Sequence, residues 1–282
     1  MKNILVTGSS GLIGSLVLKH LENTSYNIFC TYRNKHSKYI KKVNWIKTKN
    51  FKSKRFKSLK FDILVDLAWN NLDNYNSNSH IKIQVKEHFN LYKYLIKKNS
   101  KILIYSVGTC LEYGKREGKL KESFKLSPIT NYAIAKNLLR KKTIELQKKK
   151  NFSFTWLRLF YMFGNNQPKR TLYTQFMNAV KKRKKIFKMS KGEQSRDYLS
   201  TEKIALLIFK LVLKESSFGD INISSGKGIK VKDLVYRWKQ KMNSNIKIER
   251  GAIMMHNHEA YNFYGCNKKL NKILGETCKK IT

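Results

Sequence analysis

Residues 3–21 read NILVTGSSGLIGSLVLKHL: an apolar β-type run, a turn with glycines at positions 8, 11 and 14, and a helical pattern. Such glycines allow a tight turn, close approach of the backbone to a pyrophosphate and close packing of helix on strand. The amino terminus of the helix then faces the phosphates. Since a strand and a helix flank the turn as this motif requires, we predict a dinucleotide-binding site here. Its expected residues are Gly8, Ser10, Gly11, Leu12, Ile13 and Gly14.

Beyond this stretch, short apolar runs alternate with longer helical patterns, which predicts βαβ units and a parallel sheet. Strands are expected at 3–6, 27–32, 43–47, 63–68, 101–106 and 153–159, and helices at 77–98 and 132–148. After Gly164, helices at 172–182, 202–214, 231–242 and 268–274 alternate with strands at 186–189, 220–223 and 246–249. We predict an α/β fold with a doubly wound parallel Rossmann sheet in residues 1–165. A smaller C-terminal α/β substrate lobe is expected in 166–282, with elements of the two parts interleaved around one cleft.

The end of the second expected strand bears on the choice of dinucleotide. An acidic residue at this place binds a free ribose hydroxyl and repels a 2′-phosphate. Residues 31–35 read TYRNK, with no acid, and Arg33 and Lys35 could neutralise a phosphate. NADP(H) is therefore favoured as the cofactor, and NAD(H) is possible.

A tyrosine four residues before a lysine places both side chains on one helix face, where the ammonium can favour the phenolate. This spacing occurs at Tyr94/Lys98, Tyr132/Lys136 and Tyr264/Lys268. Only Tyr132 follows the fifth strand at a distance that returns its helix past the carboxyl end of the sheet, where such folds bind ligands. Tyr132 and Lys136 are thus the predicted catalytic pair.

Six motifs give the chain a specific resemblance over nearly its whole length. They are TGSSGLIG (7–14), DILVDLAW (62–69), YSVGTCLEYG (105–114), YAIAK (132–136), RLFYMFG (158–164) and RDYL (196–199). The chain resembles extended short-chain dehydrogenases/reductases of the NAD-dependent epimerase/dehydratase family, which modify nucleotide-linked sugars.

The resemblance implies roles for particular residues. Thr109 would hydrogen-bond the reacting oxygen of the sugar, Tyr132 would act as general acid or base, and Lys136 would bind the nicotinamide ribose and tune Tyr132. Leu67 and Ala68 would contact the cofactor. Arg196 would contact the substrate diphosphate, with pairing to Asp197 as the structural alternative, and Arg250 is a distant candidate for a second such arginine. Trp69 and Tyr161 stand where the family usually has Ala and Asn, so these two walls of the substrate pocket differ.

Departures from the family pattern narrow the expected reaction. Family members that dehydrate follow the catalytic Thr with an Asp and a Glu, whereas this chain has Cys110 and Leu111. Some epimerising members carry a Cys two residues after the Ser/Thr; Cys110 comes one residue after, and we interpret it as a small buried thiol. The reaction type that remains is hydride transfer coupled to the transfer of one proton.

The expected function is NADPH-dependent reduction of a nucleotide-linked 4-keto-6-deoxysugar, for deoxysugar and surface polysaccharide biosynthesis. Within the family, the chain is most similar to reductases of the dTDP-4-dehydro-6-deoxyglucose type. One alternative is a nucleotide-sugar 4-epimerase that retains NAD. A second alternative is a non-catalytic basic protein on the same fold that binds RNA or an anionic surface.

The formal net charge of +41 comes from 59 Lys and Arg against 18 Asp and Glu, with lysines scattered over the expected helices. We interpret it as a solvated basic surface that attracts anionic substrates, and we expect no nucleic-acid partner. The 4 Cys show no disulfide or zinc spacing, and His256 and His258 have no nearby acids or thiols, so no metal is expected. No run is long and apolar enough for a signal peptide or a membrane span. The expectation is a cytoplasmic protein, and relatives suggest a homodimer.

Overall fold

The computed structural model describes residues 1–33, 42–47, 53–254 and 260–275. A sheet of seven strands, all parallel, forms its centre, in the order β12-β7-β5-β4-β1-β2-β3. These strands are β1 (Asn3–Thr7), β2 (Asn27–Tyr32), β3 (Val43–Lys47), β4 (Ile63–Asp66), β5 (Leu103–Thr109), β7 (Ser153–Leu159) and β12 (Gly219–Ile223). The chain builds outward from β1 to β3 and then restarts at β4 on the other side of β1. Ligands bind at such a switch point in doubly wound sheets.

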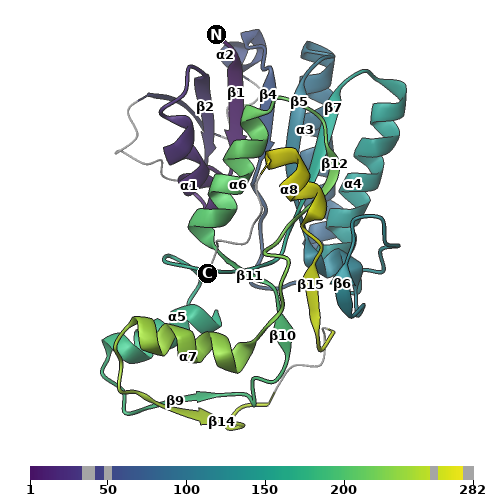
Figure 1. Ribbon diagram of the computed structural model, residues 1–282. Coiled ribbons are helices and arrows are strands. Elements are labelled where there is room, and N and C mark those ends of the chain that lie inside the picture. Colours follow the sequence, from purple (N-terminus) through teal and green to yellow (C-terminus); the bar gives the residue numbers. More distant parts are fainter. Residues whose placement is uncertain (34–41, 48–52, 255–259, 276–282) are drawn as a thin grey trace.

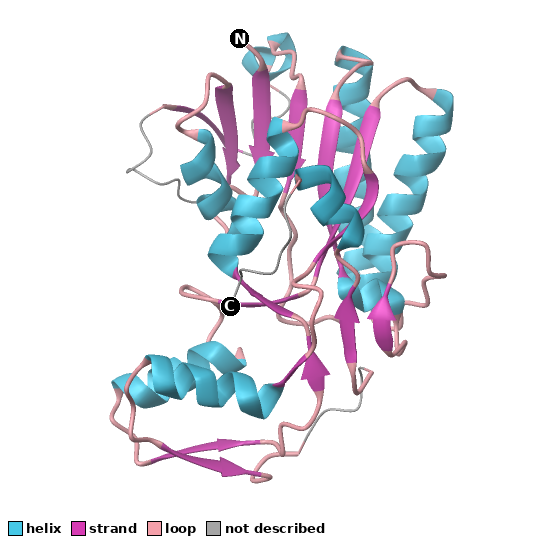
Figure 2. Ribbon diagram, viewed as in Figure 1, coloured by secondary structure: helices cyan, strands magenta, loops and turns pink. Residues whose placement is uncertain are grey.

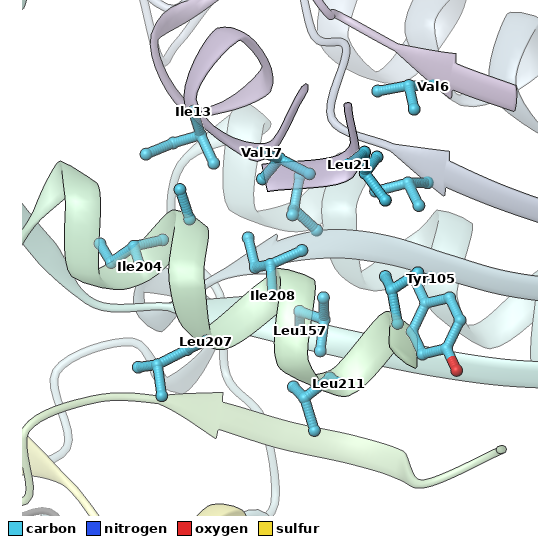
Figure 3. Packing of buried hydrophobic residues seen from close by; sticks show 14 of the residues in the cluster. Val6, Ile13, Val17, Leu21, Tyr105, Leu157, Ile204, Leu207, Ile208 and Leu211 are labelled. Carbon is cyan, nitrogen blue, oxygen red and sulfur yellow. The ribbon is translucent and has the colours of Figure 1, made fainter. Parts of the chain in front are cut away.

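Helices cover both faces of the sheet (Figures 1 and 2). One face carries α1 (Leu12–Leu21), α6 (Thr201–Leu213) and α8 (Lys268–Leu274), and the other carries α2 (Lys54–Ser58), α3 (Val85–Lys98) and α4 (Asn131–Lys149). Figure 3 shows Val17 of α1 and Ile208 of α6 packed over Leu157 of the sheet, and all three are fully buried. Strands covered on both faces need apolar side chains on both faces, which explains their nearly continuous apolar runs.

A smaller lobe lies beyond the carboxyl ends of the central strands (Figure 1). Helices α5 (Leu172–Lys181) and α7 (Val231–Lys241) pack on strands β9 (Ile186–Met189) and β14 (Lys247–Arg250), around the buried Trp238. Three short strand pairs join the lobe to the sheet region: β6 (Gly118–Leu120) with β15 (Phe263–Gly265), β8 (Tyr161–Phe163) with β11 (Tyr198–Ser200), and β10 (Ser195–Arg196) with β13 (Ile229–Lys230).

The predicted fold class is confirmed, and several element bounds differ from the predicted ones. Strand β4 ends at Asp66 rather than residue 68, and the helix expected from residue 77 starts at His80 with a π-helical turn, His80–Gln84. Elements from the C-terminal part return to the central sheet, because β12 pairs with β7 and α6 packs on α1. Among the described residues, no helix combines the length and apolar character needed to cross a bilayer.

Candidate active site

A cavity of about 1440 Å³ lies between the carboxyl ends of the central strands and the lobe. It brings together nearly all the site residues predicted from the sequence. The cavity is lined by Gly8, Ser10, Gly11, Leu12, Ile13, Gly14, Arg33, Leu67, Ala68, Trp69, Thr109, Tyr132, Lys136 and Tyr161. The glycine-rich turn and the expected catalytic residues therefore face one continuous space.

The glycine-rich turn leaves no room for side chains at Gly8 and Gly14. The Gly11 N–H donates to the Gly8 carbonyl at 2.9 Å. Gly8 has φ +64°, and a Cβ at this position would lie 2.7 Å from the backbone nitrogen of Ala68. A Cβ on Gly14 would lie 2.1 Å from the Gly8 oxygen. Helix α1 begins with Gly11 as its N-cap and has no acid in its first turn, so its amino terminus suits a pyrophosphate.

The end of β2 contributes Arg33 to the cavity lining. Its side chain is exposed, directly after Tyr32. The second basic residue predicted for this place, Lys35, lies outside the described residues. The turn is tied to β2 by the Ser9 hydroxyl, which donates to the Thr31 carbonyl at 2.8 Å.

Thr109 ends β5, and Tyr132 and Lys136 lie in the first two turns of α4. Thr130 caps this helix by accepting from the Ala133 N–H. Lys136 is 2% exposed, and its ammonium donates to the Val107 carbonyl at 2.8 Å. The Thr109 side chain lies near enough to Tyr132 to influence its pKa. The three predicted catalytic residues thus form one group at the edge of the sheet.

The surroundings shift both titratable groups of this set. Burial raises the pKa of Tyr132 well above its ordinary value, and the hydrogen bond from Thr109 opposes the rise. Burial lowers the pKa of Lys136 to about 8, although the charges of Asp66 and Glu112 act to raise it. At neutral pH, Lys136 is a cation and Tyr132 a phenol able to donate a proton.

Aromatic rings surround this group. The Lys136 Nζ lies 3.7 Å from the centroid of the Trp69 ring, a distance at which a cation is attracted by the ring. The Tyr75 ring stacks on Tyr132 at 5.0 Å. The Trp69 indole N–H donates to His80 Nδ1 at 3.0 Å, so His80 must carry its hydrogen on Nε2, which donates to the Asn74 carbonyl at 2.9 Å. His80 is therefore a neutral orienting group for Trp69.

The far wall of the cavity is lined by Tyr173 of α5, Trp238 of α7 and Arg170, with Tyr161 of β8 and Tyr198 of β11 from the strands that join the lobe to the sheet region. The Arg170 guanidinium donates to the carbonyls of Leu72 and Asp73 across the cavity mouth. Sequence reasoning did not find Arg170, since no motif marks it.

The arginine predicted to bind a diphosphate, Arg196, is not among the described residues that line the cavity. It is 5% exposed, donates to the carbonyls of Ser195 and Tyr261, and lies 4.7 Å from the ring centroid of Phe263. The Asp197 carboxylate accepts from three backbone N–H groups, those of Ser225, Gly226 and Gly265. Arg250 in β14 lies 3.7 Å from Glu193, on a strand that contributes no residue to the cavity lining.

Two buried carboxylates near the site were also missed. Asp66 accepts from the Thr7 and Tyr92 hydroxyls and from His88 Nδ1 at 2.7 Å, and the His88 ring stacks on Trp69 at 4.9 Å. Glu112 lies three residues after Thr109, and Thr-x-x-Glu is the sequence pattern of a capping box, which could have revealed it.

No cluster that could hold a metal occurs among the residues that the structure describes, and His256 and His258 fall outside them. Cys110 is 5% exposed and lies in an apolar cluster with Tyr113 and Phe160.

Comparison with known proteins matches residues 4–224 to the model of the NAD dependent epimerase/dehydratase family. A dTDP-6-deoxy-L-talose 4-dehydrogenase (NAD(+)) from Aggregatibacter actinomycetemcomitans is 23% identical, over 93% of this chain and 99% of that protein. A GDP-6-deoxy-D-talose 4-dehydrogenase from the same organism is also 23% identical, over 96% of this chain and 91% of the relative. Among solved structures, a UDP-N-acetylglucosamine 4-epimerase from Methanobrevibacter ruminantium M1, in complex with UDP-N-acetylmuramic acid, superposes with a TM-score of 0.82 and 21% identity. That superposition covers 96% of this chain and 91% of the epimerase.

Proposed function

Because the chain belongs to the NAD dependent epimerase/dehydratase family, we propose that it is an oxidoreductase acting on C4 of a nucleotide-linked 6-deoxysugar. In the proposed direction it reduces a 4-keto group to an alcohol. The observation that carries the proposal is the grouping of Thr109, Tyr132 and Lys136 at one end of a cavity that continues to the glycine-rich turn.

Each residue of the group has a chemical task in this reaction. Tyr132 donates its proton to the keto oxygen, and the Thr109 hydroxyl donates a hydrogen bond to the same oxygen as negative charge develops there. The Lys136 cation, held by the Val107 carbonyl and the Trp69 ring, stabilises the phenolate that Tyr132 leaves behind. A bound nicotinamide cofactor supplies the hydride.

The departures noted in the motif support oxidoreduction over dehydration. Cys110 and Leu111 offer no carboxylate where an eliminating enzyme needs one. The two curated relatives are named as 4-dehydrogenases of 6-deoxytalose nucleotides, and oxidation at C4 is the reverse of the proposed reduction.

For the cofactor we favour NADP(H). Arg33 lines the cavity at the end of β2, and no acid is present there to repel a 2′-phosphate. One relative is named for NAD(+), so both cofactors belong in the test.

Arg33→Asp should lower kcat/KM for NADPH by about 10-fold and leave kcat/KM for NADH unchanged, since it replaces the attractive charge by a repulsive one.

The test combines dTDP-4-dehydro-6-deoxyglucose with NADPH or NADH and follows the absorbance of the reduced nicotinamide. We expect stoichiometric loss of NADPH and one sugar product.

Tyr132→Phe should slow the consumption of NADPH by about 100-fold or more, because it removes the proton donor.

The rival outcomes are distinct. Interconversion of nucleotide sugars epimeric at C4, without net consumption of reduced cofactor, would mean a 4-epimerase. Salt-sensitive RNA binding that Tyr132→Phe leaves unchanged, with no turnover, would mean a basic binding protein.

A further inference from the structure

Glu112 is a fully buried carboxylate that contacts the backbone of Thr109. We propose that Glu112 is a positioning residue that fixes the direction of the Thr109 hydroxyl, and that a chain of ion pairs, buried at the Glu112 end, joins it to the helix carrying Tyr132 and Lys136. The proposal rests on the function proposed above for Thr109. It concerns a residue that is not among the described residues lining the cavity.

The hydrogen bonds around Thr109 determine where its hydroxyl hydrogen can point. Glu112 Oε1 accepts the Thr109 N–H at 2.8 Å, which holds the turn Cys110–Tyr113 against the end of β5. The Leu111 N–H in turn donates to Thr109 Oγ1 at 3.3 Å. Since one acceptor direction of Oγ1 is used by Leu111, its hydrogen is left to donate toward Tyr132 or a substrate oxygen.

The Glu112 carboxylate has little freedom to move. Trp156 Nε1 lies 3.1 Å from each of its oxygens, and Arg158 Nε donates to Oε2 at 2.9 Å. Gly108 makes room for this arrangement, because a Cβ there would lie 2.3 Å from Glu112 Oε1 and 2.2 Å from Trp156 Nε1. The site is therefore built around the carboxylate.

The same ion pairs continue to α4. Arg158 Nη2 donates to Asp220 Oδ2 at 2.8 Å, and Arg140 Nε lies 2.9 Å from both Asp220 oxygens. Arg140 follows Lys136 by four residues and Tyr132 by eight, so all three lie on one face of α4. The chain Glu112, Arg158, Asp220 and Arg140 thus links the turn that holds Thr109 to the helix that presents Tyr132.

This network contributes more to the positioning of Thr109 than to the stability of the fold. Buried ion pairs often contribute little net stability, because desolvation offsets their attraction, whereas breaking one leaves an uncompensated charge. An apolar residue could fill the same space, but it could not accept the Thr109 N–H. A carboxylate at position 112 does both, which explains its presence in an interior that favours apolar residues.

The test is a double-mutant cycle with Glu112→Gln and Thr109→Val, using the exposed Glu145→Gln on α4 as the matched control. Glu112→Gln should lower kcat by about 10- to 100-fold, with the KM for the reduced cofactor within about twofold, since a misplaced donor costs transition-state stabilisation. In the Thr109→Val background the same substitution should cost less than about twofold. Glu145→Gln should behave as wild type.

Full activity of Glu112→Gln, or multiplication of the two losses, would overturn the proposal. If Glu112→Gln does not fold, Asp220→Asn serves in the same cycle, because its carboxylate is the other acidic link and is partly exposed. A crystal structure of either variant gives a readout independent of turnover. The proposal requires that the Thr109 side chain shifts relative to Tyr132, and an unchanged Thr109 contradicts it. Absence of wild-type turnover would instead count against the proposed function alone.

Discussion

Lys136 shows how one buried side chain couples packing to chemistry. Its ammonium has exchanged water for the Val107 carbonyl and the face of Trp69, and this burial lowers its pKa to about 8. Because burial disfavours the charged form, the ammonium loses its proton more easily than it would in water. Because burial raises the pKa of Tyr132 instead, the two groups titrate in separate pH ranges.

This separation predicts the pH dependence of the enzyme. The protonated Lys136 predominates below its pKa of about 8, so kcat/KM for the proposed ketone reduction should be level near neutrality and fall as pH rises through about 8. Lys136→Arg keeps a cation that does not titrate, so any activity that remains in it should show no fall near pH 8. Initial rates across pH 6 to 10 measure both profiles. A decline in the Arg variant at the same pH would assign the titration to another group.

At the scale of elements, Asp66 joins three parts of the fold. It lies at the end of β4 and accepts hydrogen bonds from Thr7 at the end of β1 and from His88 and Tyr92 on α3. Burial alone would raise its pKa, but the charge and hydrogen bond of His88, together with the hydrogen bonds from the Thr7 and Tyr92 hydroxyls, outweigh burial and lower the pKa to about 2. The carboxylate therefore fixes α3 against the strands that bear the glycine-rich turn.

The depressed pKa implies a pH-dependent contribution to stability. A carboxyl with a lower pKa in the folded than in the unfolded state stabilises the fold above its unfolded pKa of about 4, and this contribution is lost as pH falls toward about 2. The shift corresponds to about 2 kcal/mol at neutral pH. Asp66→Asn should accordingly lower the free energy of unfolding by at least this amount at pH 7, and by less at about pH 3. Urea titrations of both proteins at the two pH values measure the difference, and an equal loss at both would contradict the electrostatic explanation.

The features that depend on residues close together in the sequence were predictable. The glycine-rich turn and the Tyr132/Lys136 pair depend on spacing within a single unit, and the structure brings them to one cavity. The Asp66–His88 contact depends on the packing of α3 against β4 across 22 residues, which periodicity does not describe. The environment of Arg196 depends on Tyr261, distant in sequence, so a motif match alone could not determine what it contacts.

On the scale of the whole molecule, the site lies between the sheet region and the lobe, which have separate hydrophobic cores. Clusters around Val17 and Ile208 on one face and around Leu139 and Trp156 on the other hold the sheet, and a separate cluster around Trp238 and Phe176 holds the lobe. The cavity is bounded by both regions, so its width depends on the contacts that cross from one to the other. Arg170, just before α5, makes such a contact with the carbonyls of Leu72 and Asp73, and its guanidinium lies 5.7 Å from the ring centroid of Tyr75.

Removing this crossing contact should loosen the mouth of the cavity without changing its catalytic end. Arg170→Ala should raise the KM for the nucleotide sugar by about 3- to 10-fold and change kcat by less than about twofold, because it weakens ground-state and transition-state binding alike. Arg170→Lys keeps the charge but loses the forked pair of donors, so its KM should lie between those of the wild type and of Arg170→Ala. The control is Lys169→Ala, which changes the exposed neighbouring residue. Amide hydrogen exchange over residues 71–76 should quicken in Arg170→Ala, since this loop would lose one of the contacts that hold it, although the Tyr75 carbonyl still accepts the Tyr132 N–H. Unchanged exchange together with an unchanged KM would mean that the width of the cavity is determined by the hydrophobic cores themselves.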